Sequence, residues 1–285
     1  MRSPAGTAVR ATADPATRRR IGGAAVATVY AAAATVLVAT GTTRIRYSAD
    51  HERTIDVWEI WIPVAAALLV ARLAPPRLPP HPPEPTADRP RREALACVAI
   101  AAGFAAAAIA LQGWVIPLKI VLLAVAPTLV LSHQAWLTGF PQRDAYRRWW
   151  WAGPAVATAT WLGLAWAGPY ARPSTDQATL IALLAGFVVN AYIEERFYRG
   201  WLQTRLEHVY GRWTAIGAAS LLWAVWHLSL HSTGRPLIDI ATVVAHHGVL
   251  GLLLGYLWSR YRNPWPLLLI HAAVNTPLAL LTTVG

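Results

Sequence analysis

The chain alternates between long apolar runs and short segments that are rich in arginine, proline or glycine. Each run approaches the roughly 20 residues that an α-helix needs to cross the hydrocarbon core of a bilayer. The runs lie at residues 21–41, 55–74, 94–111, 115–131, 149–166, 178–206, 213–230, 237–258 and 264–283. This spacing predicts an all-α, polytopic membrane protein with about 8–9 transmembrane helices.

Polar segments separate these runs. Residues 1–20 carry several arginines and no apolar run, so we expect a disordered, basic N-terminus. Residues 42–54 carry charges of both signs and are expected to form a loop, as are the basic residues 142–148. Residues 75–92 are so rich in proline that they cannot be helical throughout, and we expect a linker there.

Composition and the placement of charge narrow the class of protein. Of the 285 residues 55% are hydrophobic and only 14% are charged, which is too apolar for an ordinary soluble domain. The formal charge of +11 would suit a nucleic-acid partner, but the arginines lie between the apolar runs, as the positive-inside rule requires. We therefore expect a protein of the plasma membrane with a cytoplasmic N-terminus and no nucleic-acid partner. Abundant arginine and alanine beside a single lysine, Lys119, favour a bacterial source, and no pattern indicates an oligomeric state.

Two adjacent glutamates, Glu194 and Glu195, follow an apolar run. A charged side chain inside a membrane segment costs on the order of 3 kcal/mol unless it is paired, protonated or hydrated. On a helix Glu195 and Arg199 are four residues apart and lie on one face, which predicts a structural ion pair. Glu194 points about 100° away and has no such local partner. We therefore predict a functional role for Glu194 and a supporting role for Glu195 and Arg199.

Further polar residues lie inside the later apolar runs. His227 lies in the run at residues 213–230, and His271 and Asn275 share one face of the last run. A buried glutamate is a strong base, a neutral histidine can orient a water molecule, and histidine and asparagine N–H groups can donate to an oxyanion. For His246 and His247 we favour plain hydrogen bonds to a neighbouring helix. We interpret the nearby tryptophans Trp223 and Trp226 as packing residues in the same way.

Taken in order, these residues resemble the three motifs of the CPBP (Abi) family, the intramembrane endopeptidases related to type II CAAX prenyl proteases. The matching motifs are Glu194-Glu195-x-x-x-Arg199-Gly200, Trp223-x-x-x-His227 and His271-x-x-x-Asn275. One position departs from the pattern, because the second motif usually begins with phenylalanine rather than tryptophan. The resemblance covers residues 149–285, which we expect to form a CPBP-like protease domain after the N-terminal transmembrane helices at residues 21–148.

The resemblance implies a mechanism and a place for it. Glu194 would be the general base that activates water, His227 would help to hold that water, and His271 and Asn275 would form the oxyanion site. The active-site cavity would lie among the last four helices and open to the cytoplasm. The reaction would be hydrolysis of a peptide bond near the C-terminus, or in a membrane segment, of a peptide or membrane protein. In a bacterium that lacks prenylated proteins, a peptide precursor or membrane-protein tail is a better substrate than a CAAX protein.

Two rival functions follow from the same residues. A non-catalytic member of the family, such as a bacteriocin-immunity or scaffold protein, would need no base opposite an oxyanion donor. A transporter or proton relay would also place glutamate and histidine inside the membrane. The sequence has no repeated pair of helices broken by glycine or proline, which transporters often show.

A metal is not required by this set of residues. The zinc motif HExxH is absent, and the family's better-supported mechanism is metal-free. Glu194, His227 and His271 are suitable ligands for zinc, but Glu195 would then have to serve as the base. A carboxylate beside Arg199 is a poor base, so we predict a site without a cofactor.

Overall fold

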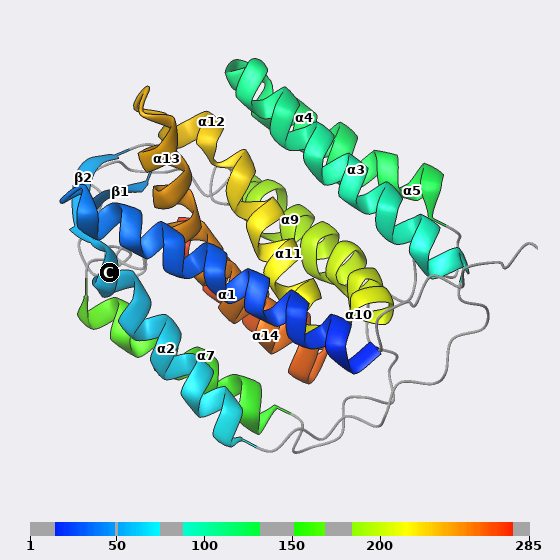
Figure 1. The fold of residues 1–285 in the computed structure, drawn as a ribbon, viewed down its shortest axis with the longest axis horizontal. Helices are drawn as coiled ribbons and strands as arrows, with labels where there is room; N and C mark the ends of the chain where they lie inside the picture. Colours follow the sequence, from blue (N-terminus) through cyan, green and yellow to red (C-terminus); the bar gives the residue numbers. More distant parts are fainter. Residues whose placement is uncertain (1–14, 49–50, 75–87, 132–150, 169–183, 276–285) are drawn as a thin grey trace, which may run out of the picture.

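The computed structural model describes residues 15–48, 51–74, 88–131, 151–168 and 184–275, most of which are helical (Figure 1). Helix α1 (Pro15–Ala39) is followed by two short strands, β1 (Arg44–Ser48) and β2 (His51–Asp56), and by α2 (Val57–Leu73). Helix α3 (Asp88–Ala110) turns at η1 (Gln112–Trp114) into a second rod that contains α4 (Val115–Leu118), η2 (Lys119–Val125) and α5 (Ala126–Val130). We call residues 88–130 the α3–α5 hairpin.

The C-terminal part begins with α7 (Ala152–Ala167). One continuous rod, residues 184–210, contains η5 (Phe187–Tyr192), α9 (Ile193–Glu195), η6 (Arg196–Gln203) and α10 (Thr204–Tyr210). It leads to α11 (Arg212–Trp226), α12 (Leu228–His231), α13 (Pro236–Val243), η7 (Val244–Gly248), α14 (Val249–Tyr261) and α15 (Pro264–Asn275). Helices therefore lie where the apolar runs predict them, although residues 178–183 and 276–283 of the expected helices fall outside the described residues.

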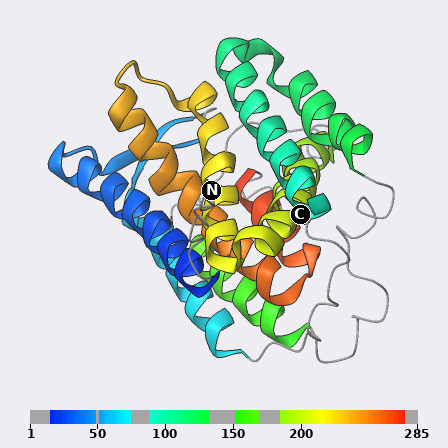
Figure 2. The same ribbon diagram turned by 45° about the vertical axis from the view of Figure 1, so that its right-hand side comes forward.

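Helix α11 lies at the centre of the fold and packs against α1, α3, α10 and α14. Helices α2 and α7 lie side by side along one edge, and the α3–α5 hairpin lies along the opposite edge (Figure 1). The hairpin also stands apart from α2 and α7 after the molecule is turned (Figure 2). The rod at residues 184–210 thus has the hairpin on one side and α14 and α15 on another.

Glycines on α14 allow its backbone to approach the neighbouring helices closely. A Cβ atom at Gly251 would lie 2.9 Å from the Cβ of Ser220 in α11, and one at Gly255 would lie 2.8 Å from Oε1 of Gln203. The Gln203 amide Nε2 donates a hydrogen bond of 2.8 Å to the carbonyl oxygen of Gly255. This close contact ties α14 to the rod that carries the two glutamates.

The described part of the chain contains five helical stretches that are long and apolar enough to cross a membrane. They are Ile21–Ala39, Arg91–Ala110, Gln112–Val130, Arg212–His231 and Pro236–Tyr261. Helices α2 and α7 are present as expected but have 17 and 16 residues, which is shorter than these spans. The chain is therefore a mostly helical, integral membrane protein, and the count of about nine spans stays a prediction.

The expectation of a loop at residues 42–54 is wrong, because its described part forms an antiparallel pair of strands. Ile45 lies opposite Ile55 in the register, and both side chains are buried. They join a small apolar cluster with residues of α1, α2 and α13. Polar and apolar residues alternate along β1, the pattern of a half-buried strand, but β2 has a single apolar residue, Ile55, and the mixed charges of the segment obscured this signal.

Two expected boundaries are also corrected. Helix α1 begins at Pro15, within the residues expected to be disordered, and residues 1–14 lie outside the described part. Proline suits the first position of a helix, and the arginines that follow are good helix formers. Helix α3 begins at Asp88, within the expected linker, where an acidic side chain suits the helix dipole. Residues 75–87 of that linker and the expected loop at residues 142–148 lie outside the described part.

Candidate active site

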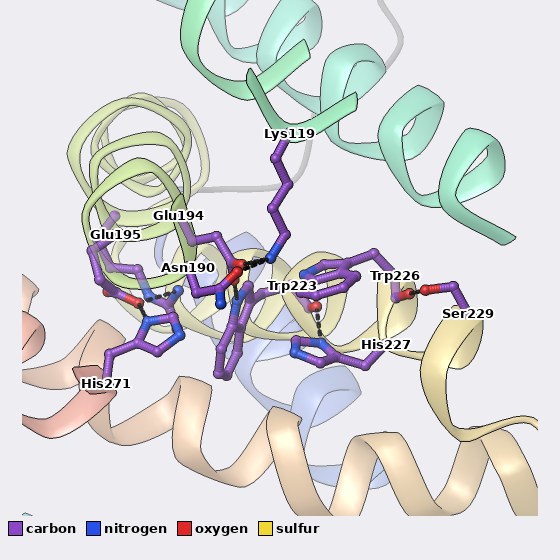
Figure 3. Close-up of polar contacts among 10 residues, drawn as sticks. Lys119, Asn190, Glu194, Glu195, Trp223, Trp226, His227, Ser229 and His271 are labelled. Carbon is purple, nitrogen blue, oxygen red and sulfur yellow. Dashed lines mark hydrogen bonds and ion pairs between the residues drawn. The ribbon is translucent and has the colours of Figure 1, made fainter. Parts of the chain in front are cut away.

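The two glutamates lie in α9, a single short turn between the π-helical segments η5 and η6. Such wide turns inside helices occur mostly at functional sites. Glu194 is 1% exposed and Glu195 is 3% exposed. Their side chains leave the rod in different directions, as their spacing predicts, so each glutamate has its own neighbours (Figure 3).

Glu194 is paired with Lys119, the single lysine of the chain. The Lys119 Nζ atom lies 2.5 Å from Oε1 of Glu194, and the indole Nε1 of Trp223 donates to Oε2 at 2.5 Å. Glu194 thus has no local partner, as its spacing predicts, but it has a distant ionic partner that the sequence does not indicate. Its partner comes from the α3–α5 hairpin, so the site extends beyond the last four helices (Figure 3).

Glu195 has two partners, and both contact the same oxygen atom. Arg199 Nη1 donates to Oε1 at 3.1 Å, which confirms the ion pair predicted from the spacing of four residues. His271 Nδ1 lies 2.7 Å from the same Oε1. A carboxylate only accepts hydrogen bonds, so Nδ1 of His271 carries the proton and Nε2 of a neutral ring is left as an acceptor. Glu195 thus fixes both the Arg199 side chain and the tautomer of His271.

His227 lies at the break between α11 and α12. Its Nδ1 is 3.0 Å from the carbonyl oxygen of Trp223, which can only accept, so Nδ1 donates and Nε2 is left as an acceptor. The ring stacks between Trp226, at a centroid distance of 3.8 Å, and His247, at 3.6 Å. His227 is therefore held on both faces, with one ring nitrogen left for chemistry.

The other histidines lie around His227 rather than apart from it. The ring of His247 lies 4.2 Å from that of His246 and 5.1 Å from that of His231. The expected hydrogen bonds of His246 and His247 to a neighbouring helix are not made by their Nδ1 atoms, which are buried without a partner among the described residues. These two residues contribute to a stacked group of rings next to the site.

Trp223 joins the separate parts of the site. Its indole N–H binds Glu194, and its ring centroid lies within 5.9 Å of the rings of His227, His247 and His271. Trp223 is buried in the core, as its interpretation as a packing residue predicts, and its hydrogen bond to Glu194 adds a role that this interpretation did not include. Packing geometry gives it both an aromatic and a polar role, as is usual for buried tryptophan.

Asn275 is the one predicted site residue that the structure does not bring to the glutamates. It is exposed at the end of α15, one turn beyond His271. Within the described ranges none of the hydrogen bonds involves its side chain. Its role in holding an oxyanion stays a prediction.

A small pocket lies between η6, α14 and α15, among the helices where the cavity is predicted. Its wall is mostly apolar and contains the carboxylate of Glu195 rather than that of Glu194. Oε2 of Glu195 is buried without a hydrogen-bond partner among the described residues. The residues that line the pocket are Tyr192, Glu195, Arg196, Gly200, Trp258, Pro264, Leu267 and Leu268.

The donor set does not fit a zinc ion in this arrangement. Among the described residues, no three or more His, Cys, Asp or Glu side chains lie close enough together to hold a metal. The side chain of Lys119 also lies where a cation bound to Glu194 would be placed.

Comparison with known proteins places this site in a family. Residues 176–277 match the family model described as type II CAAX prenyl endopeptidase Rce1-like. This match over the C-terminal part of the chain supports membership of the CPBP/CAAX protease family. Its matched domain contains both glutamates and all of the predicted histidines, and Lys119 lies before it. The searches of curated proteins and of solved structures found no match.

Sequence reasoning missed the residues that surround Glu194. They are Lys119, Asn190, which accepts a hydrogen bond from Lys119, and Trp223, whose indole N–H donates to Glu194. A signal for Lys119 was present, because a lysine inside an apolar run needs a partner as much as a glutamate does. The choice of Glu194 as that partner depends on how the hairpin packs, and no local rule contains that information.

Proposed function

We propose that this CAAX-protease relative is an intramembrane endopeptidase in which Glu194 activates the water that hydrolyses a peptide bond. The observation that carries the proposal is a buried carboxylate inside the Rce1-like domain that is bound by Trp223, whose ring lies against the rings of His227, His247 and His271. Buried carboxylates beside histidine rings are suited to general acid–base chemistry.

Glu194 retains lone pairs that can accept a hydrogen bond from water, although each of its two oxygens already accepts one. An ionised carboxylate offers about four lone-pair sites, and Lys119 and Trp223 use two of them. A water held by a remaining site can lose a proton to Glu194 as it attacks a carbonyl carbon. We assign His227, whose Nε2 is left as an acceptor, to the same water.

His271 has the tautomer that Glu195 imposes on it. A histidine held in this way is a fixed polar group rather than a free ring, which suits the stabilisation of charge in a transition state. We assign His271 to the reacting carbonyl, together with Asn275 once a substrate lies against the end of α15. Glu195 and Arg199 then serve to hold His271 and the rod in place.

A second mechanism is favoured by one specific observation. Glu195 lines the pocket and has a buried oxygen without a partner among the described residues. In that mechanism the Glu195–His271 pair would activate water, and Glu194 with Lys119 would be the structural pair. Matched variants of the two glutamates separate these mechanisms.

The two rival functions require different features of the protein. An immunity or scaffold protein requires the fold but not the carboxylate of Glu194, and a transporter requires a path for its solute.

We further propose that the substrate is a peptide precursor or the tail of a membrane protein. We place the N-terminus in the cytoplasm, so reporter fusions at Pro82 and Gly211 should report the same compartment.

The experiment compares the membrane peptides and proteins of cells that express either the wild-type protein or Glu194→Gln. The glutamine variant keeps the size of the side chain and removes the base. We expect at least one uncleaved membrane protein or peptide to accumulate in the variant, with its cleavage product found only in the wild type. Identical profiles at equal amounts of folded protein would refute the proposed activity.

A further inference from the structure

Lys119 is a buried cation that the assigned chemistry does not use. It is the single lysine of the chain, is 3% exposed, and lies in η2 of the α3–α5 hairpin. The hairpin precedes the residues that match the Rce1-like family. A lysine in such surroundings is costly and needs a reason for its position.

Lys119 contacts the candidate base, Glu194, and two residues near it. Its Nζ lies 2.5 Å from Oε1 of Glu194 and donates at 2.6 Å to Oδ1 of Asn190, one turn earlier on the same rod. The ammonium group also lies 4.3 Å from the ring centroid of Trp226, on which His227 stacks. The lysine therefore reaches from one helix pair into the site and contacts it through three residues (Figure 3).

Charge balance gives this contact a function. In an apolar interior an isolated charge is far more costly than a neutral pair, so the sum of charges should change little during a reaction. At rest, the ammonium of Lys119 balances the carboxylate of Glu194. When Glu194 accepts a proton from water, that negative charge disappears and the cation alone remains.

We propose that Lys119 is a positioning residue of the hydrolytic reaction, which holds Glu194 as an oriented carboxylate and then balances the charge of the oxyanion. This inference rests on the proposed function. It assigns part of the active site to the hairpin outside the Rce1-like domain.

Hydrolysis has two steps, the attack of water and the loss of the amine. One proton of water passes to Glu194, the water oxygen bonds to the carbonyl carbon, and the electron pair of the C=O bond moves to oxygen. The negative charge thus moves from Glu194 to the oxyanion, while Lys119 stays protonated throughout. When the C–N bond breaks, the electron pair leaves with nitrogen, the carbonyl forms again, and Glu194 gives its proton to the amine. Lys119 neither donates nor accepts a proton.

The test uses the full-length protein purified in detergent and a fluorogenic peptide built on the cleavage site found in the cell experiment. Lys119→Met removes the charge and keeps a flexible chain, and Lys119→Arg keeps the charge. We expect Lys119→Met to lower kcat about 10²-fold per folded molecule with KM changed little, as for the loss of a group that acts on the transition state. Lys119→Arg should recover much of that loss.

The matched control is Leu123→Ala, which removes a fully buried apolar side chain from the same segment η2. We expect it to lower the folded fraction but to leave kcat of the folded molecules unchanged. An equal loss of kcat in the control, or a wild-type kcat in Lys119→Met, would overturn the proposal.

A stability measurement separates this inference from the proposed function. Lys119→Met leaves the Glu194 charge unpaired and should lower the Tm, and the double variant with Glu194→Gln should recover most of the loss. Equal Tm values for the single and double variants would contradict the ion pair itself. If the wild type cleaves no peptide but the coupling in Tm is found, the proposed function fails and Lys119 is a structural residue only.

Discussion

The two adjacent glutamates differ in where their partners come from. Glu195 is paired within the residues that match the family model, to Arg199 on the same rod and to His271 on α15. Glu194 is paired with a residue outside that match, Lys119 of the α3–α5 hairpin, and its other oxygen is bound by Trp223 of α11. Neighbouring residues of the same type thus lie in separate ionic networks.

This difference suggests a division of labour between folding and chemistry. Arg199 is fully buried, and its ionic contact is made with Glu195, so the loss of Glu195 leaves a buried cation without its balancing charge. Glu194 is bound by a lysine side chain from a separate hairpin, so its charge is balanced by a residue outside the family match. Each of the two ion pairs can be broken by one substitution, so their roles can be compared directly.

The largest effect on stability is expected from Glu195→Gln. Removal of one partner of a buried ion pair costs about 3–5 kcal/mol because the remaining charge is uncompensated. Denaturation of the purified variant in detergent measures this loss. The control is Glu207→Gln, whose partner Arg262 is less buried, and a smaller loss is expected there. A Glu195→Gln protein as stable as the wild type would contradict the supporting role of this residue.

A smaller effect is expected from Trp223→Phe, which removes the hydrogen bond to Oε2 of Glu194. Hydrogen bonds to charged groups contribute about 1.5–3 kcal/mol, so the free energy of unfolding should fall by no more than this amount. Phenylalanine is the usual residue at this position of the motif, and Lys119 still orients the carboxylate. We therefore expect cleavage to continue, and its complete loss in a folded variant would show that Lys119 alone does not hold Glu194.

The smallest effect is expected from the removal of metal. The described residues offer no set of three metal ligands, and Lys119 already provides a positive charge at Glu194. Activity of the purified protein should be the same before and after exhaustive chelation, with elemental analysis of the same sample. Stoichiometric zinc, with activity that is lost on its removal and restored on its return, would contradict this prediction.

The sequence predicts the features that depend only on residues close together in the chain. Apolar length places the helices, and the spacing of four residues gives the ion pair between Glu195 and Arg199. The directions of the two glutamates follow from the pitch of a helix. The strand pair at residues 44–56 was missed because charged residues alternate with isoleucine, and mixed charge also suits a loop.

The sequence does not predict which distant groups meet. Lys119 was noted as the single lysine of the chain, but its contact with Glu194 depends on the packing of the hairpin against the rod. The contact of His271 with Glu195 also depends on tertiary packing. Local spacing places both His271 and Asn275 on one face of α15, and only the tertiary packing decides which of them reaches a carboxylate.

The most direct test of the account compares cleavage by purified Glu194→Gln and Glu195→Gln, each corrected for its folded fraction. The substrate is the same fluorogenic peptide, and folded protein is quantified in the same preparation. If Glu194 is the base, the folded fraction of Glu194→Gln should show no cleavage above the background, and the folded fraction of Glu195→Gln should still cleave. Cleavage by Glu194→Gln at the wild-type rate, with none by folded Glu195→Gln, would contradict the account and assign the base to the Glu195–His271 pair.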